Sequence, residues 1–575
     1  MQGPSRQPAT RSMPKTEVEH AEAADEAVVR TSHDQGLMPI MATMTAHSIA
    51  HSRSADLAAA VSGALAAATA LAVGEIVAGL VSGAPSLVIA IGDLVIDLQP
   101  PGAKEVMVDL FGTNDKLVLN LLIVVGAALI AAAVGVAARR SWNVGVGAFV
   151  IAGAVGLFAA WREPLTSNVL ALATVVVAVV IGLAVLRLLL STTVPAWATT
   201  ATTGEAIPSP SDATRADAQA WDRRRFLILG GGVAVATVAI GAVGRTLLEN
   251  KPGGPEVGSQ LPPVKTGTTV SVPTDASLSV VGITPIVMPN ERFYRIDTAL
   301  LVPKVDVSTW SVKLTGMVDK EVTLTYDQLQ AMPLFEQFVT IACVSNNVGG
   351  NLVGNALWKG VHLRDVLAMA GVHPDASQIV GRSVDGFTVG FPTDWAMDPS
   401  RDPMIALGMN GQPLPTEHGY PARLIIPGLY GYVSATKWLS EIELTTLDAF
   451  DAYWVPLGWA KEAPILTQSR IDVPRNGASV ATGPVTVAGV AWAPDRGVSA
   501  VEVKVDDGAW MPAKLSSPLA KAAWVQWQVD WNATAGQHTI EVRATDGNGI
   551  VQTADQTTPA PDGARGHHSV SVQVS

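Results

Sequence analysis

Cys343 is the only cysteine in the 575-residue chain, and it lies in the segment 341–350, Ile-Ala-Cys-Val-Ser-Asn-Asn-Val-Gly-Gly. A chain with a single cysteine cannot form an internal disulfide. The thiol is therefore an inert buried side chain, a nucleophile or a ligand to a soft metal ion. The role of this thiol decides the chemistry that the protein can perform. The elements around Cys343 must position the thiol for that role.

The composition indicates a membrane protein with a separate polar part. Hydrophobic residues make up 48% and charged residues 15% of the chain, which is more apolar than a soluble average. The apolar residues are concentrated between about residues 55 and 245. The formal net charge of −12 argues against a nucleic-acid partner, because no basic stripe offsets it. The length exceeds what one core can organise, so we expect several domains.

Five apolar segments are long enough to cross a bilayer, since about 20 helical residues span its hydrocarbon core. A further apolar segment, 86–100, is shorter and carries Asp93 and Asp97, so we expect it to be re-entrant or interfacial. The five predicted spans are 57–80, 117–138, 142–160, 166–190 and 226–246.

The arginines predict the orientation of these spans, because cytoplasmic loops carry an excess of Lys and Arg. Arg139-Arg140, Arg187 and Arg223 to Arg225 can all lie on the cytoplasmic side if the segment near 86–100 does not cross. The N-terminal tail, which we expect to be disordered, is then cytoplasmic as well. Five crossings place everything after about residue 250 outside the cytoplasm, so we predict a multi-pass protein of the cell membrane with its polar half extracytoplasmic.

The predicted membrane part offers few groups for redox chemistry. No histidine occurs between His51 and His362, which excludes bis-histidine haem ligation among the spans. Glu75, Asp93 and Asp97 could mark a quinone or proton site, because carboxylates inside a membrane are costly. Solvated helix ends or helix-packing sites are the more common explanation, and both interpretations stay open here.

An arginine motif precedes the fifth span. Residues 223–227, Arg-Arg-Arg-Phe-Leu, are followed by an apolar run and contain the pattern Arg-Arg-x-Phe-Leu, which resembles a twin-arginine export signal. That route exports folded proteins, often around a cofactor inserted in the cytoplasm. No convincing small-residue cleavage site follows, so we expect 223–249 to remain as an anchor helix.

The second half of the chain begins with a pattern typical of an α+β domain. Residues 310–316 alternate like a strand, and Thr325 is a possible N-cap of a helix. Residues 363–370 predict a short helix that stops at Gly371.

Regularly spaced short strands follow near the C-terminus. Apolar and charged residues alternate in 501–506 ahead of Asp507-Gly508, a hairpin signal, and the alternation recurs in 524–531 and 538–544. This spacing is typical of an immunoglobulin-like β-sandwich, here without a disulfide. The predicted organisation is a disordered cytoplasmic tail (1–54), transmembrane helices (55–195), a cytoplasmic linker (196–222), the signal and anchor helix (223–249), a linker (250–279), an α+β domain (280–465) and an all-β sandwich (466–575).

Two motifs in the α+β part carry a family resemblance. The first comprises Cys343, Asn346, Gly-Asn-Ala at 354–356, Trp358, Gly360 and Leu-Arg-Asp-Val-Leu at 363–367. The second comprises His-Gly-Tyr-Pro-Ala-Arg-Leu at 418–424, Pro-Gly-Leu-Tyr-Gly at 427–431 and Lys-Trp-Leu at 437–439. Together they resemble the molybdopterin-binding core of the sulfite oxidase family. Segments 487–492 and 501–506 are similar to the first strands of that family's dimerisation domain, so the resemblance covers roughly 280–575.

The resemblance implies roles for individual residues. In the family this cysteine is the thiolate that ligates molybdenum, a role that suits a soft ligand. Cys343 is therefore the predicted metal ligand and a catalytic residue. Arg423 and Lys437 are implied donors to the cofactor's phosphate, and His418 can bond the pterin or the phosphate. The remaining implied site residues are the cofactor contacts Tyr294 and Arg295 and the active-site tyrosine Tyr453.

One position departs from the family pattern. Sulfite oxidases hold their anionic substrate with arginines, one of them five positions after the ligating cysteine, where this chain has Val348. Arg292, Arg295 or Arg364 could compensate. Members of the family that reduce sulfoxides, including oxidised methionine, have a neutral substrate that suits a less charged pocket.

We therefore expect a membrane-anchored molybdenum-cofactor oxidoreductase that performs two-electron oxygen-atom transfer on a small sulfur-containing or related substrate. The alternative on the same site is a methionine sulfoxide type reductase, and the alternative of another class is a non-catalytic cell-surface binding module. No haem or iron–sulfur cluster is expected, so electrons pass to or from a separate partner, a quinone or a cytochrome. Because the sandwich resembles the family's dimerisation domain, a homodimer through the sandwich is possible.

Overall fold

The computed structural model describes residues 38–99, 110–111, 115–192, 212–255, 259–264 and 270–575. Among these described residues, those from Ala58 onward form one compact unit, and those before it belong to another. Most of the predicted tail 1–54 and of the linker 196–222 lies outside the described residues, as does Pro100 at the end of the predicted re-entrant segment.

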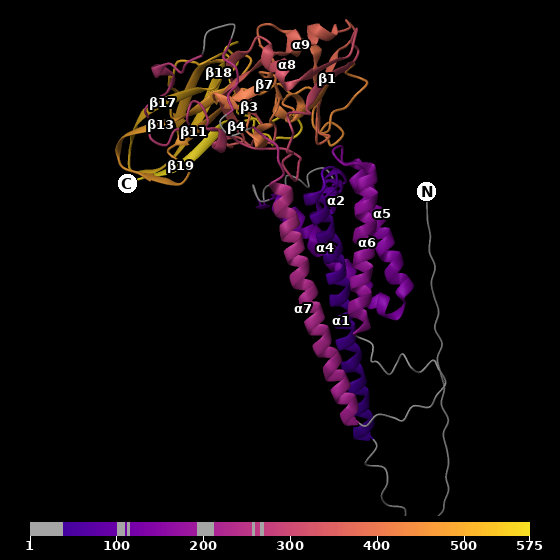
Figure 1. Ribbon diagram of the computed structural model, residues 1–575. Helices are drawn as coiled ribbons and strands as arrows, with labels where there is room; N and C mark the ends of the chain where they lie inside the picture. The colour runs from indigo at the N-terminus through magenta and orange to yellow at the C-terminus, as the bar shows by residue number, and fades with distance from the viewer. Residues whose placement is uncertain (1–37, 100–109, 112–114, 193–211, 256–258, 265–269) are drawn as a thin grey trace, which may run out of the picture. The chain divides into compact units, whose positions relative to one another are not determined.

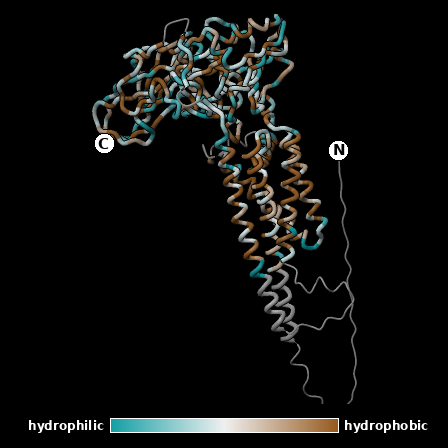
Figure 2. The backbone as a smooth tube through the Cα atoms, viewed as in Figure 1, coloured by the Kyte–Doolittle hydropathy of each residue, from teal (hydrophilic) through white to brown (hydrophobic). Residues whose placement is uncertain are grey.

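Five helices in the described part of the chain are long and apolar enough to cross a membrane, which confirms the five predicted segments. Figure 1 draws them as long helices, and Figure 2 shows hydrophobic residues along most of their length. The apolar stretches are 54–80, 117–140, 142–162, 168–191 and 223–249. They belong to helices α1 (Met38–Leu80), α4 (Asp115–Arg140), α5 (Trp142–Arg162), α6 (Asn168–Ser191) and α7 (Asp212–Glu249).

Small residues let two of these helices approach closely. A Cβ atom on Gly63 of α1 would collide with the backbone of Ala131 in α4, and one on Gly135 would collide with the backbone of Ala59. Close backbone contact of this kind is typical of membrane helices, where packing rather than water exclusion drives association.

The predicted re-entrant segment forms the short helix α2 (Leu87–Asp97). The side chain of Ser86 caps its first turn by accepting a hydrogen bond from the Ile89 amide at 3.2 Å. Eleven residues make a helix of roughly 16 Å, about half of what a bilayer core requires. The helix packs among α4 and α5, so it lies within the bundle without crossing it.

The α+β part consists of two sheets with short helices at their edges. One sheet has the order β2-β1-β10-β5-β6, and the other has the order β3-β4-β7-β8, with β9 also pairing to β7. The strands are β1 (Ser311–Gly316), β2 (Val322–Thr325), β3 (Phe335–Ala342), β4 (Val353–His362), β5 (Gln378–Ser383), β6 (Thr388–Pro392), β7 (Met404–Met409), β8 (Gln412–Pro413), β9 (Arg423–Ile425) and β10 (Leu439–Thr445). The helices are α8 (Tyr326–Ala331), α9 (Leu363–Ala370), α10 (Thr393–Met397) and α11 (Gly431–Ser434), with single 3₁₀ turns at Thr274–Ala276, Asn290–Arg292 and Thr416–His418.

Local signals in the sequence explain where two of these helices begin and end. The Thr325 hydroxyl caps α8 by accepting from the Gln328 backbone amide, and the Thr325 backbone amide donates in return to Oε1 of Gln328. This reciprocal pair is a capping box, and it confirms the predicted N-cap. Helix α9 ends at Gly371, as predicted, where φ is +73°.

The C-terminal part is a β-sandwich of two sheets, β11-β13-β17-β16 and β12-β19-β18-β14-β15. Strands β14 and β15 pair antiparallel across the predicted turn at Asp507-Gly508. A core of apolar side chains fills the space between the sheets, including Val503, Trp527 and Val542. The strands are β11 (Gln468–Val473), β12 (Ala478–Val480), β13 (Gly483–Trp492), β14 (Val498–Val505), β15 (Met511–Pro512), β16 (Lys514–Leu515), β17 (Val525–Ala533), β18 (Gly536–Asp546) and β19 (His568–Val574).

The sandwich and the α+β part share a second core. Trp492 and Trp524 of the sandwich belong to the same buried cluster as the side chains of β3 and β4. The indole nitrogen of Trp524 donates to the carbonyl oxygen of Ile286 over 2.7 Å, and the Thr340 amide donates to the carbonyl oxygen of Ala522 over 2.9 Å. The end of the predicted linker also joins the sandwich, because the Leu278 amide donates to Gln526. The sandwich therefore supports the sheet that leads to Cys343.

Candidate active site

Cys343 directly follows the last residue of β3, at the start of the loop that returns to β4. Its amide donates to the carbonyl oxygen of Leu352 over 2.9 Å, and its own carbonyl oxygen accepts from the Asn346 amide over 3.1 Å. The side chain of Asn346 closes the loop by accepting from the Leu352 amide over 2.8 Å. The paired strands and the loop bonds fix the backbone that carries the thiol.

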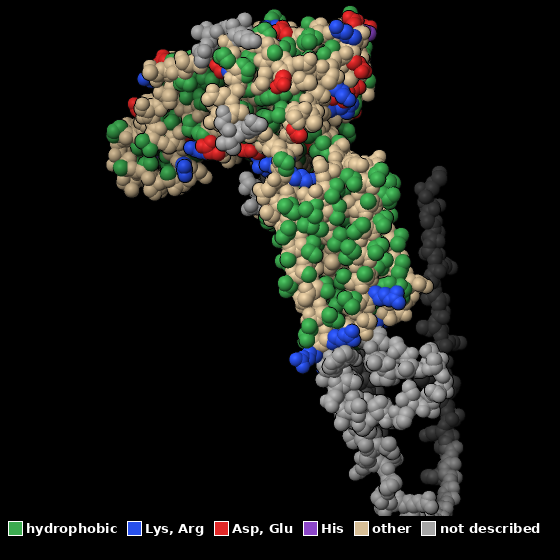
Figure 3. Space-filling view, in the orientation of Figure 1, with side chains coloured by type: hydrophobic (Ala, Val, Ile, Leu, Met, Phe, Trp, Pro, Cys, Tyr) green, Lys and Arg blue, Asp and Glu red, His purple; other side chains and the backbone are tan. Residues whose placement is uncertain are grey.

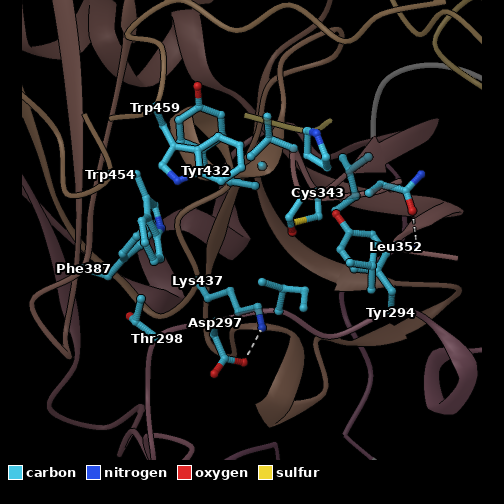
Figure 4. A pocket seen from close by; sticks show the side chains of 18 of the residues that line it. Tyr294, Asp297, Thr298, Cys343, Leu352, Phe387, Tyr432, Lys437, Trp454 and Trp459 are labelled. Carbon is cyan, nitrogen blue, oxygen red and sulfur yellow. Dashed lines mark hydrogen bonds and ion pairs between the residues drawn. The ribbon is translucent and has the colours of Figure 1, made fainter. Parts of the chain in front are cut away.

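The thiol of Cys343 is free and half-buried, and its Sγ lies 2.9 Å from Oγ of Ser345. It lines a cavity of about 400 Å³ that we call the Cys343 cavity. Figure 4 shows Tyr294 and Leu352 beside the cysteine, with Phe387, Trp454 and Trp459 across the cavity. Seven aromatic side chains line the cavity: Phe293, Tyr294, Phe387, Tyr432, Trp438, Trp454 and Trp459.

Arg423, the first residue of β9, lines the same cavity and is only 3% exposed. One nitrogen of its guanidinium donates to the carbonyl oxygen of His418 over 3.1 Å, and the group lies over the ring of Trp358. Its Nε has no hydrogen-bond partner among the described residues. Burial lowers the pKa of Arg423 to about 10. A buried cation with an unsatisfied donor is costly, and an anionic or hydrogen-bond-accepting ligand would relieve that cost.

Lys437 supplies the second cation of the cavity lining. Its Nζ donates to Oδ2 of Asp297 over 2.9 Å and to the carbonyl oxygen of Glu417 over 3.1 Å. Figure 4 shows this pair at one side of the cavity. Because Asp297 neutralises the ammonium group, the pair adds hydrogen-bonding capacity without a net charge.

Sequence comparisons identify the part of the chain that builds this cavity. Residues 299–454 match the oxidoreductase molybdopterin binding domain, and residues 468–542 match a bacterial Ig domain. Residues 299–454 belong to the sulfite oxidase family of molybdopterin-binding domains. The chain is 30% identical to human mitochondrial sulfite oxidase over 304 residues, which is 44% of this chain and 55% of the relative.

Other members of the family match over a similar region. Nitrate reductase [NADH] 1 from Oryza sativa subsp. japonica is 29% identical over 309 residues, 43% of this chain and 34% of that protein. The crystal structure of the sulfane dehydrogenase SoxCD from Paracoccus pantotrophus aligns with a TM-score of 0.43 and 23% identity, over 52% of this chain and 86% of that one. The chain therefore spans about half the length of the sulfite oxidases that it matches.

The residues of the Cys343 cavity fit the molybdenum-molybdopterin cofactor of this family. A free thiol is the soft ligand that the metal needs, and the unsatisfied Nε of Arg423 suits an acceptor on the pterin or its phosphate. Tyr294 lies on the same wall, and burial raises the pKa of its phenol, so the hydroxyl stays protonated at neutral pH. When bound, the cofactor supplies a molybdenum ion that exchanges two electrons and one oxygen atom with a substrate. Cys343 would ligate it, with Arg423 and Lys437 holding the organic part.

Three of the predicted site residues lie away from the cavity lining. His418 is 2% exposed, and its Nε2 donates to the carbonyl oxygen of Asn290 over 2.9 Å. Arg295 is half-exposed and lies 3.6 Å from Asp297. The hydroxyl of Tyr453 donates to Asp97 of α2 over 2.9 Å. Their predicted roles in cofactor binding and catalysis stay predictions.

The structure also adds residues that the motifs did not indicate. Asp297 and Asp385 line the cavity as carboxylates, and Thr558 and Pro559 reach it from the loop before β19 of the sandwich. These residues belong to segments distant in the sequence and carry no motif of their own. Only the fold brings them to the cysteine.

None of the cations considered as replacements for the missing arginine lines the Cys343 cavity. Val348, Arg292 and Arg295 are absent from its walls, and Arg364 is paired with Asp402 at 3.0 Å. Among the described residues, Arg423 and Lys437 are the Lys and Arg side chains that line it. Two basic and two acidic side chains therefore line the cavity together with the aromatic side chains.

Proposed function

We propose that this protein is a membrane-anchored molybdenum-cofactor oxidoreductase that performs oxygen-atom transfer on a small sulfur-containing substrate outside the cytoplasm. One observation carries the proposal: the chain's single thiol lies free in the wall of a 400 Å³ cavity, beside a buried arginine with an unsatisfied donor. Neither feature suits an inert core, and both suit a ligated metal cofactor.

The distribution of charge along the helices supports an anchored, extracytoplasmic site. Figure 3 shows hydrophobic side chains over the helices, with Lys and Arg side chains near their ends. Arg223 to Arg225 begin the apolar stretch of α7, and the catalytic half follows the other end of that helix, beyond Glu249. If the arginines are cytoplasmic, as is usual, the catalytic half lies on the opposite side. The twin-arginine motif is consistent with export of a folded domain, and a Lys-Lys replacement of Arg223 and Arg224 should abolish export.

The walls of the cavity favour a neutral substrate. Sulfite carries two negative charges. Of the two cations on the wall, Lys437 is paired with Asp297 and Arg423 is assigned to the cofactor, so neither neutralises such an anion. A neutral sulfoxide needs only a hydrogen-bond donor and an apolar surface, which protonated Tyr294 and the aromatic side chains provide. Reduction of sulfoxides of the methionine sulfoxide type is therefore the second candidate function, and this charge balance favours it over sulfite oxidation.

The reaction also needs an electron partner. A separate donor or acceptor, a quinone or a cytochrome, exchanges electrons with the cofactor.

The sandwich is a candidate surface for a homodimer, by its resemblance to the family's dimerisation domain. Light scattering of the detergent-extracted protein measures the oligomeric state, and a monomeric mass would exclude the dimer.

Metal and pterin analysis of the membrane-extracted protein tests the proposed cofactor. We expect molybdenum and pterin in equal amounts, and a Cys343→Ser variant should lose about 100-fold in turnover, since loss of a metal ligand removes the group that holds the ion. Val348→Ala is the matched control, because it changes a side chain of the same loop that does not line the Cys343 cavity. Protein without molybdenum or pterin, or a fully active Cys343→Ser variant, would contradict the proposal.

A pair of assays with artificial redox dyes separates the two candidate substrates. Sulfite oxidation is followed with an oxidising dye, and methionine sulfoxide reduction with a reduced viologen. We expect the sulfoxide to be the better substrate. Efficient sulfite oxidation without sulfoxide reduction would show that the charge argument is wrong while leaving oxygen-atom transfer in place.

A further inference from the structure

A second cavity lies where the ends of the apolar helices meet the catalytic half, and we call it the helix-end cavity. Its volume is about 490 Å³. One part of its wall comes from α2 and from the segments that follow α1 and α5. The other part comes from the catalytic half, through residues 298–304, 385–387 and Tyr453.

The two cavities are neighbours. Thr298, Asp385 and Phe387 line both of them, so a single layer of side chains separates the helix-end cavity from the cavity at Cys343. The Asp385 carboxylate accepts a hydrogen bond from the Phe387 amide over 3.1 Å. Burial raises the pKa of Asp385, so this carboxyl can hold a proton between the two cavities.

The chemistry of the helix-end cavity is amphipathic. Apolar side chains of α2, including Ile89 and Leu94, face it together with Leu300 and Leu301. Its titratable groups are the four carboxyl groups of Asp93, Asp97, Glu163 and Asp385, the three cations Arg162, Lys251 and Lys304, and the phenol of Tyr453.

The arrangement of these polar groups disfavours an anionic ligand. Arg162 is paired with Asp97 at 2.5 Å, and the same carboxylate accepts from Tyr453 over 2.9 Å. With Asp385 protonated, three carboxyl groups stand beside three cations on the described wall, so the wall offers a phosphate head group no excess of positive charge. A neutral head group that exchanges protons suits this wall better.

We propose that the helix-end cavity binds the head group of a lipid-soluble quinone, which exchanges electrons with the site at Cys343. The inference rests on the proposed function and names its electron partner. In the reductive direction, a quinol loses two electrons and two protons and becomes a quinone. Those two electrons and two protons convert a sulfoxide into a thioether and water. The carboxylates of the helix-end cavity accept the protons, and Asp385 lies on the boundary across which they pass.

Photolabelling locates the site without relying on turnover. The full-length, cofactor-loaded protein is placed in phosphatidylcholine nanodiscs with an azidoquinone bearing a decyl tail. We expect the label on peptides that contain 82–97, 162–166 or 298–304, and we expect excess decylubiquinone to remove it. Label confined to other helices, or label displaced by phosphatidylglycerol but not by decylubiquinone, would overturn the proposal.

Variants that fill the helix-end cavity test whether the quinone label binds there. Val302 is half-buried in the wall of the helix-end cavity, and Val302→Trp should lower labelling about tenfold by occupying the space. Val281→Trp makes the same change at a residue that is 95% exposed and outside both cavities, and it should leave labelling unchanged. Thr166→Trp fills the cavity from the helix side and replaces Val302→Trp if that variant fails to fold. Equal labelling in all variants would show that the quinone binds elsewhere.

Two electron donors separate this inference from the proposed function. Val302→Trp should lower decylubiquinol-driven turnover about tenfold, in line with lost binding, while viologen-driven turnover stays within about twofold. Viologen-driven turnover without specific quinone labelling would refute the quinone site alone. Absence of turnover with either donor would count against the proposed function, and the labelling result would still decide the binding site.

Discussion

Arg470 in β11 of the sandwich donates a hydrogen bond to the carbonyl oxygen of Gly350 over 2.8 Å. The sandwich thereby holds the loop that begins at Cys343. The same guanidinium donates to Asp472 over 2.7 Å and to the hydroxyl of Thr284 over 2.8 Å. Arg470 as a whole is 8% exposed. A buried cation with three partners connects two parts of the chain that are far apart in sequence.

Replacing Arg470 with leucine should therefore destabilise the catalytic half. The change leaves the carboxylate of Asp472 buried without its cation, which typically costs about 3–5 kcal/mol. Thermal unfolding of the detergent-extracted protein measures the effect, and molybdenum content reports whether the Cys343 loop is still held. Arg543→Leu is the control, because its pair with Glu502 is about a quarter exposed and should contribute under about 1 kcal/mol. Equal effects of the two variants would contradict the role of Arg470.

Replacing Lys437 with methionine should weaken retention of the cofactor. Methionine keeps most of the side-chain volume but removes the closer of the two cations beside Asp297, since Arg295 lies at 3.6 Å. The carboxylate would then repel a phosphate in the Cys343 cavity more strongly. We expect at least about a tenfold loss of pterin affinity, corresponding to about 1.4 kcal/mol. Pterin content after extended dialysis measures it. Lys313→Met on the exposed face of β1 is the control, and a Lys437→Met protein with full pterin content would rule out the predicted contact.

Gly349 lies in the Cys343 loop at a φ of +75°, and a Cβ atom there would collide with the ring of His568. Gly349→Ala should cost about 1–3 kcal/mol of unfolding free energy, from the strained backbone and the collision together. His568→Ala removes the ring, so the double variant should lose less stability than the two single variants combined. Strictly additive losses in this cycle would show that the ring is not what excludes a side chain at Gly349.

The stability of the protein should fall in mild acid partly through His418. Burial lowers the pKa of His418 in the folded protein to about 4, from an ordinary value of 6.5. As the pH falls below about 6.5 the unfolded chain takes up this proton first, and the folded state loses about 3 kcal/mol by pH 4. His418→Gln removes this loss, so the difference in stability between the variant and the natural protein should change with pH in that window.

Melting temperatures of the natural protein and of His418→Gln between about pH 7 and about pH 4.5 measure this difference. An identical pH dependence for His418→Gln and the natural protein would contradict the assignment.

The elements with local causes were predictable from the sequence. Each of these elements depends on neighbours a few residues away along the chain. They are the apolar runs long enough to cross a membrane, the helix cap at Thr325, the helix end at Gly371 and the turn at Asp507-Gly508. Such contacts form in any fold that contains the segment, so their pattern can be read directly from the residues.

The sequence by itself determined which residue is the metal-ligand candidate, since Cys343 is the sole thiol and two motifs accompany it. Only the tertiary structure decided which side chains surround that thiol. It placed Asp297 and Trp459 on the cavity, directed Tyr453 to Asp97, and set a second cavity behind Asp385. The physical reason is that a cavity wall is assembled from segments far apart in the chain, and no local periodicity records which of them will meet.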